Sequence, residues 1–142
     1  MNRFFSVVVL AGLLLFSALG GPAAAVDFTS ADLQGAWHLH AFGAYDLKGT
    51  FYYGNITLNG DGQIVASGDA SYGWSPAVFD GGGLIIFPNG SVGGKLSGLS
   101  FDWGGFWIAV QHGWMNLTKD KITFIGVDYE NYQLLVTMVR VE

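Results

Sequence analysis

Short runs of alternating apolar and polar residues cover most of the chain after residue 32. No long stretch repeats its apolar residues at helical spacing, and Gly, Asn or Asp interrupts the alternation every eight to twelve residues or so. Successive side chains of a strand point to opposite faces, so this pattern is typical of an all-β protein. It predicts about eight strands, over residues 33–42, 49–58, 63–72, 83–88, 91–98, 105–112, 121–128 and 132–141.

Tight turns separate these runs. Asn59-Gly60-Asp61-Gly62 and Asn89-Gly90 supply residues that tolerate positive φ between alternating segments, which favours hairpins. Successive hairpins predict an antiparallel up-and-down meander that is closed, or nearly closed, into a barrel. Gly81-Gly82-Gly83 lacks the lysine and helix start of a phosphate-binding loop, and we interpret it as a flexible connection.

The alternation also predicts which residues face inward. Trp37 and Leu39 share one face of the first strand, and His38 and His40 share the other, so we expect the tryptophan inside and the histidines outside. On the third strand we expect Ile64, Ala66, Gly68 and Ala70 to face inward, so the inward residues become small along this strand. Small inward residues suit a tightly curved barrel whose interior is either filled or leaves a small cavity.

The first 25 residues have the features of a secretory signal peptide. A basic start at Arg3 precedes an apolar run from Phe4 to Leu19, and Pro22 and a run of small residues ending at Ala25 follow. An uncleaved membrane anchor is the alternative. We therefore expect a signal peptide over 1–25, a single β-barrel domain over 26–142, and export to the periplasm or the outside of a bacterial cell.

Composition narrows the possible chemistry. The chain has no cysteine, which rules out disulfides, thiolate metal sites and thiol nucleophiles and mildly favours a bacterial exported protein. Eleven acidic residues against six basic ones, without a basic cluster, argue against a nucleic-acid partner. An outer-membrane barrel is a further alternative, but the inward polar pattern of such barrels is missing, so we expect no membrane insertion of the mature chain.

Histidines and carboxylates are the candidates for metal binding or catalysis. His38 and His40 could chelate a metal with His112, yet an outward-facing pair is explained more simply as two polar residues on a solvent-exposed strand face, and we predict no metal site. Asp61, Asp80, Asp120 and Asp128 fall in predicted turns, and only Asp69 and Asp102 lie near strand interiors or aromatic residues. No nucleophile, base and orienting group can be named together, so we expect a non-enzymatic protein without a cofactor, a hydrolase or isomerase being the alternative.

Aromatic residues make up 15% of the chain and are the most informative of the residues not yet considered. Buried, they would fill the core; at a barrel mouth they could hold an apolar molecule or stack on a sugar ring. We predict ligand contacts from Tyr52, Trp74, Trp103 and Trp107.

The first strand begins Gly35-Ala36-Trp37, and Arg140 lies on the last strand. A Gly-x-Trp at the start of a β-meander resembles the opening of the calycins, which include lipocalins, fatty-acid-binding proteins and avidins. The resemblance covers residues 33–142, and the wider layout also looks like small lipocalin-like domains of bacterial exported proteins. It implies that Gly35, Trp37 and Arg140 form a structural signature, with the arginine packed across the indole. Later lipocalin motifs and the biotin-contacting residues of avidins are missing.

Three functions follow from these patterns. The first is a binding module for a small hydrophobic or aromatic ligand at the open end of the barrel, and a sugar-binding variant uses the same aromatic residues. The second is a structural or interaction module of the cell envelope with a packed interior, which exposed Ile85, Phe87 or Tyr53 on an unpaired strand would favour. The third is the enzyme, which a convergence of Asp69, Asp102 and His112 would support.

Overall fold

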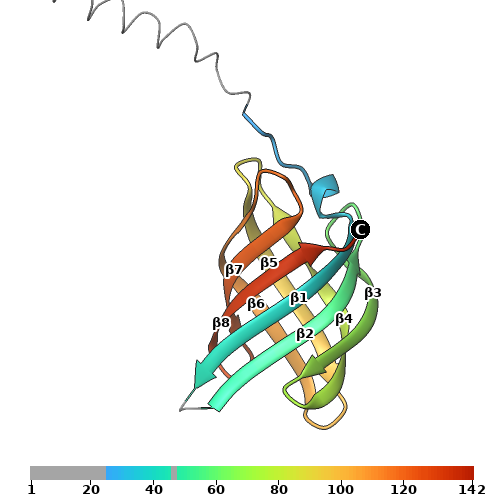
Figure 1. Ribbon diagram of the computed structural model, residues 1–142, viewed down its shortest axis with the longest axis vertical. Helices are drawn as coiled ribbons and strands as arrows, with labels where there is room; N and C mark the ends of the chain where they lie inside the picture. Colours follow the sequence, from blue (N-terminus) through green and yellow to red (C-terminus); the bar gives the residue numbers. More distant parts are fainter. Residues whose placement is uncertain (1–24, 46–47) are drawn as a thin grey trace, which may run out of the picture.

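The computed structural model describes residues 25–45 and 48–142, which form a closed eight-stranded antiparallel barrel (Figure 1). A short 3-10 helix, η1 (Ser30–Leu33), precedes the strands. The strands are β1 (Gly35–Tyr45), β2 (Lys48–Leu58), β3 (Ile64–Tyr72), β4 (Ser75–Ile86), β5 (Ser91–Ser100), β6 (Gly104–Met115), β7 (Lys121–Asp128) and β8 (Gln133–Arg140). The predicted signal peptide, apart from Ala25, lies outside the described residues.

Each strand pairs with its sequence neighbours, and β1 pairs with β8 to close the wall. The all-β meander and the closed barrel are therefore confirmed. Closure places Trp37 directly opposite Arg140. The described part of the chain contains no helix long and apolar enough to cross a membrane.

The two ends of the barrel differ. Both η1 and the last residues of β8 lie at one end, which we call the terminal end (Figure 1). The turns after β3, β5 and β7 lie at the other end. Two of them carry strongly exposed aromatic side chains, Trp74 after β3 and Phe101 with Trp103 after β5, so we call it the aromatic end.

Side chains from all eight strands and from η1 fill the interior. The largest fully buried ones are Trp37, Tyr52, Phe79, Phe124, Leu33, Leu39, Ile56, Leu58, Leu84, Leu96, Ile108 and Ile122. His40 is exposed and His38 is partly exposed on the outer face of β1, as the alternation predicted. The inside and outside of the first strand are confirmed.

The start of β4 corrects the sequence interpretation. The strand begins at Ser75 rather than at residue 83, and Gly81-Gly82-Gly83 lies inside it instead of forming a flexible connection. Gly82 has a φ of +79°, and a Cβ there would lie 2.1 Å from the carbonyl oxygen of Lys95 on β5. Glycines here permit close strand pairing at an irregular register, and Asp80 consequently sits in the strand rather than in a turn.

The inward face predicted for the third strand is also partly wrong. Register shifts between β2 and β3 add a residue to the alternation, so Ala66 and Gly68 are exposed while Ala70 is buried. The small inward residues that suggested a cavity therefore do not line the interior along most of β3.

The wall has one weak seam, between β3 and β4. These strands pair at Ala70–Tyr72 with Ser75–Ala77, and an isolated bridge joins Gln63 to Gly83. Between these points the Ser67 hydroxyl accepts a hydrogen bond of 3.0 Å from the Phe79 backbone N–H. This segment of the wall is held by side chains more than by a backbone ladder.

Candidate functional site

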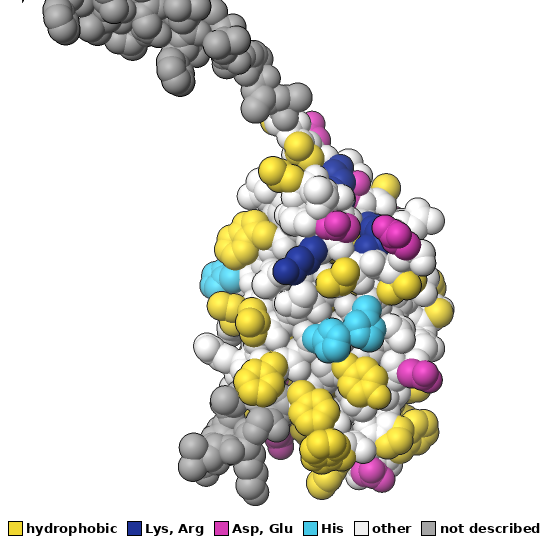
Figure 2. Space-filling view, viewed as in Figure 1, with side chains coloured by type: hydrophobic (Ala, Val, Ile, Leu, Met, Phe, Trp, Pro, Cys, Tyr) yellow, Lys and Arg dark blue, Asp and Glu magenta, His cyan; other side chains and the backbone are white. Residues whose placement is uncertain are grey.

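The terminal end of the barrel is closed by the segment that precedes β1. Phe28 and Leu33 are buried, and the indole Nε1 of Trp37 donates a hydrogen bond of 2.7 Å to the Leu33 carbonyl. Lys119 forms an ion pair of 2.9 Å with Asp32 and lies over the Phe28 ring. The charged residues of this end are visible in the upper part of Figure 2.

The predicted signature residues meet at this closed end. The Arg140 guanidinium lies 4.4 Å from the centre of the Trp37 ring and donates hydrogen bonds to the carbonyls of Asp32, Gln34 and Lys119. A Cβ on residue 35 would lie 2.8 Å from its Nη1, and Gly35 has a φ of +130°. The glycine of Gly-x-Trp is needed because it makes room for the arginine.

A buried polar cluster occupies the interior at the aromatic end. The Tyr52 hydroxyl donates a hydrogen bond of 3.1 Å to Asp128 Oδ2, and the Tyr72 and Tyr129 hydroxyls lie 2.9 Å apart. The rings of Tyr52 and Tyr72 stack with centroids 4.6 Å apart. Burial, together with the Asp128 charge, raises the pKa of Tyr52, so this hydroxyl stays protonated and acts as a donor.

Asp128 has a dual role that the sequence pattern predicted only in part. Its Oδ1 accepts hydrogen bonds from the backbone N–H groups of Glu130 and Tyr132, which is the turn chemistry expected of it. Its side chain is nevertheless fully buried, with Oδ2 directed at Tyr52. Nothing in the local sequence distinguishes this aspartate from Asp61 or Asp120, because its partner lies on β2.

Two hollows lie on the outer wall toward the aromatic end. The first, of about 340 Å³, spans β8, β1 and β2 and is lined by His40, Ala41, Phe42, Phe51, Tyr52, Tyr53, Leu135 and Thr137. The second, of about 460 Å³, spans β2 to β4 and the turn after β5. Its lining is Tyr53, Gly68, Asp69, Ala70, Ser71, Trp74, Pro76, Ala77, Val78 and Phe101. Figure 2 shows apolar side chains gathered in this lower region, below the histidines.

Hydrogen bonds fix the turns that carry the exposed aromatic side chains. The Gly73 N–H donates to the Phe51 carbonyl at 2.7 Å, which holds the Trp74 turn against β2. In the next turn the Phe101 N–H donates to the Pro76 carbonyl at 3.0 Å, and the Trp103 N–H donates to the Ser100 hydroxyl. Trp74 is 95% exposed and Phe101 is 70% exposed, so the turns are held in place while their rings are open to solvent.

The structure separates the four residues predicted to contact a ligand. Tyr52 is buried inside the barrel and also borders the first hollow. Trp74 lines the second hollow, and Trp103 is exposed on the neighbouring turn. Trp107 is half-buried on the outer wall of β6, with Lys95 Nζ 5.6 Å from its ring centre. They do not share one pocket, and their role in binding stays a prediction.

The histidines do not converge on one centre. His38 and His40 lie side by side with ring centroids 4.5 Å apart, and His38 Nδ1 is 2.6 Å from Asn55 Oδ1. His112 is on β6, and β7 and β8 separate that strand from β1. Within residues 25–45 and 48–142, no group of three or more His, Asp or Glu side chains is placed to hold a metal ion.

The acidic candidates are also apart from one another. Asp69 lines the second hollow on β3, whereas Asp102 is at the tip of the turn after β5, where its backbone N–H donates to the Ser75 hydroxyl. His112 lies toward the other end of β6. The convergence that would support an enzyme is therefore not found among these three residues.

Comparisons with known proteins support the architecture alone. No protein-family model matches the sequence, and no curated protein matches it. A de novo designed fluorescence-activating β-barrel is similar in structure, with a TM-score of 0.51 and 14% identity over 80% of this chain and 99% of that one. A redesigned β-barrel has a TM-score of 0.49 and 11% identity, covering 82% of this chain and 99% of its own. The strand order of the structure itself defines the chain as an eight-stranded antiparallel meander barrel, and the likeness to the fluorescence-activating barrel agrees with this fold.

Sequence reasoning missed the outer-wall contacts of Phe42, Phe51 and Phe101. Phe51 and Trp74 meet edge to face with centroids 5.3 Å apart, and Phe42 and Phe101 each line one hollow. The alternation of each strand places Phe42 and Tyr53 on the outer face, and this was the signal available in the sequence. The expectation of binding at the barrel mouth made no use of it.

Proposed function

We propose that the protein is a non-enzymatic binding module that takes its ligand on the outer wall at the aromatic end. The observation that carries the proposal is the second hollow, where Tyr53, Trp74 and Phe101 surround about 460 Å³ of open space. The interior is filled by the core, so the ligand site is assigned to the wall instead of to the lumen.

Energetics support this assignment. Covering an exposed aromatic side chain contributes on the order of 2 kcal/mol, and the backbone of the turns that carry the rings is already held by hydrogen bonds. Little backbone entropy is therefore lost when a ligand covers them. A compound with a flat apolar face, such as a small aromatic molecule, fits this surface.

The test is a binding measurement with the neutral fluorescent probe N-phenyl-1-naphthylamine. We expect saturable binding to the wild-type protein and at least a tenfold weaker affinity for Trp74→Ala. Trp114→Ala is the matched control, because Trp114 is also an exposed tryptophan but lies near the terminal end of β6. Equal loss in the two variants, or no binding at all, would overturn the proposal.

A second candidate is an interaction module of the cell envelope. Ile85 and Phe87 are exposed near the terminal end, although Ile85 pairs with Gly93 of β5 and does not lie on an unpaired strand. Because the barrel is closed, a partner would pack on these exposed apolar side chains instead of adding a strand. Size-exclusion chromatography with light scattering and a pull-down from envelope proteins test this function. A strict monomer that captures no envelope protein would contradict it.

We also propose that the chain is an exported relative of the calycins. The packing of Arg140 on Trp37 beside Gly35 supports the relationship, and the segment over 1–25 supports export. Amino-terminal sequencing of protein from fractionated cells tests export. A mature start after Ala25 in the periplasm or medium is expected, and an intact chain in the cytoplasm would contradict it.

A further inference from the structure

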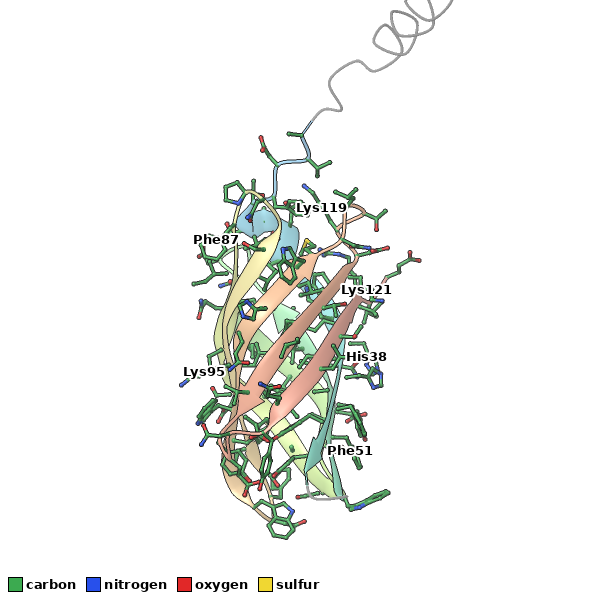
Figure 3. The ribbon with its side chains drawn as sticks, turned by 90° about the vertical axis from the view of Figure 1, so that its left-hand side faces the viewer. His38, Phe51, Phe87, Lys95, Lys119 and Lys121 are labelled. Atoms are coloured by element: carbon green, nitrogen blue, oxygen red, sulfur yellow. The ribbon has the colours of Figure 1, made fainter. Side chains whose placement is uncertain are left out.

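The two hollows of the outer wall form one continuous surface. Tyr53 lines both of them, and the edge-to-face pair of Phe51 and Trp74 joins the first hollow to the second. We name the joined surface the aromatic track; it runs from Leu135 on β8 across β1 and β2 to Phe101. Figure 3 shows His38 and Phe51 projecting from this side of the barrel, and Lys95 projecting from the other.

We propose that the aromatic track binds an extended chain of neutral sugar units, an inference that rests on the proposed function and specifies its ligand. A compact molecule would fill one hollow. Two hollows joined at Tyr53 instead suit a ligand with repeating units, because each unit can occupy one hollow while the linkage crosses the shared ring.

The charges along the aromatic track disfavour anionic ligands. None of the described side chains lining it is Lys or Arg, and its one carboxylate is Asp69. An anionic polymer would lose water from its charges there without gaining a cation. Sugar hydroxyls gain acceptors instead, since the Asp69 carboxylate, the His40 imidazole and the Thr137 hydroxyl all lie in the lining.

The aromatic rings supply the other half of sugar recognition. A hexopyranose ring with equatorial substituents presents C–H groups on both faces and hydroxyls around its edge. Trp74 has at most one face occupied by its edge-to-face contact with Phe51, so the other face is open for stacking. Glucose and N-acetylglucosamine units in β-1,4 linkage have this equatorial arrangement, and they are the class that the track fits.

The experiment is calorimetric titration of the protein with cello-oligosaccharides and chito-oligosaccharides from disaccharide to hexasaccharide. Because the longer chain reaches both hollows, we expect the hexasaccharide of at least one series to bind at least tenfold more tightly than its disaccharide. Tyr53→Ala should abolish that gain, and Trp114→Ala should leave it unchanged. Polygalacturonate, an anionic chain, should not bind.

Asp69→Asn separates this inference from the function on which it rests. The variant should weaken hexasaccharide binding about tenfold and leave the affinity for N-phenyl-1-naphthylamine unchanged. If the apolar probe binds through Trp74 but neither sugar series binds, the sugar inference fails while the proposed function stands. If neither probe nor sugar binds, both fail. An affinity that does not depend on the length of the sugar chain would also contradict binding along the aromatic track.

Discussion

At the scale of single residues, Arg140 is the side chain on which the closed end depends most. It stacks on Trp37 and donates hydrogen bonds to three backbone carbonyls. Replacing it with Met keeps the length but leaves those carbonyls without their donor. We expect Arg140→Met to lower the free energy of unfolding by about 3 kcal/mol, measured by urea denaturation. Lys121→Met, an exposed cation at the same end, is the control and should change it by less than about 0.5 kcal/mol.

Tyr52 gives a second residue-scale prediction, in the alkaline range. Its pKa is raised in the folded protein by burial and by Asp128, so the folded state keeps the proton when the unfolded chain loses it above about pH 10. The contribution of Tyr52 to the free energy of unfolding is therefore complete below about pH 10 and is lost progressively above that pH. We expect the stability advantage of wild type over Tyr52→Phe to fall by about 1.4 kcal/mol per pH unit there. A pH-independent difference in urea denaturation would contradict this.

At the scale of strands, alternation and turn residues predicted most elements because each signal is local. The Gly-x-Trp strand and the Asn59–Gly62 hairpin are examples, since inward parity and positive φ are both visible in a few residues. The beginning of β4 was not predictable in this way. Pro76 and three consecutive glycines are read locally as breakers, whereas their pairing with β5 is set by contacts distant in sequence.

Gly82 tests this explanation of β4. A Cβ there would meet the Lys95 carbonyl oxygen at 2.1 Å in addition to the unfavourable positive φ, so we expect Gly82→Ala to destabilise the protein by about 3 kcal/mol or more. Gly73→Ala is the matched control: its φ is +58° but nothing lies within 4 Å of the added atom. It should cost only about 1 kcal/mol. Equal effects in thermal or urea unfolding would refute a steric role for the glycines within β4.

For the molecule as a whole, the candidate site was less predictable than the fold. Composition drew attention to the aromatic residues, but it could not divide them between interior and wall. The register shift in β3 decides that Ala66 and Gly68 face out, and the turn hydrogen bonds decide where Trp74 and Phe101 stand. A barrel expected to bind at its mouth therefore proves to have a packed interior and an aromatic wall.

A pair of variants separates binding on the wall from binding in the interior. Leu96 is fully buried on β5, away from both hollows, and Leu96→Ala should lower the free energy of unfolding by about 3 kcal/mol. Its affinity for N-phenyl-1-naphthylamine should nonetheless match that of wild type, because the ligand does not enter the core. Trp74→Ala should show the reverse, with stability within about 0.5 kcal/mol of wild type and affinity at least tenfold weaker. Ile108→Val provides a milder interior change if Leu96→Ala does not fold. A ligand held inside the barrel would instead make affinity respond to the interior variants and leave it insensitive to Trp74.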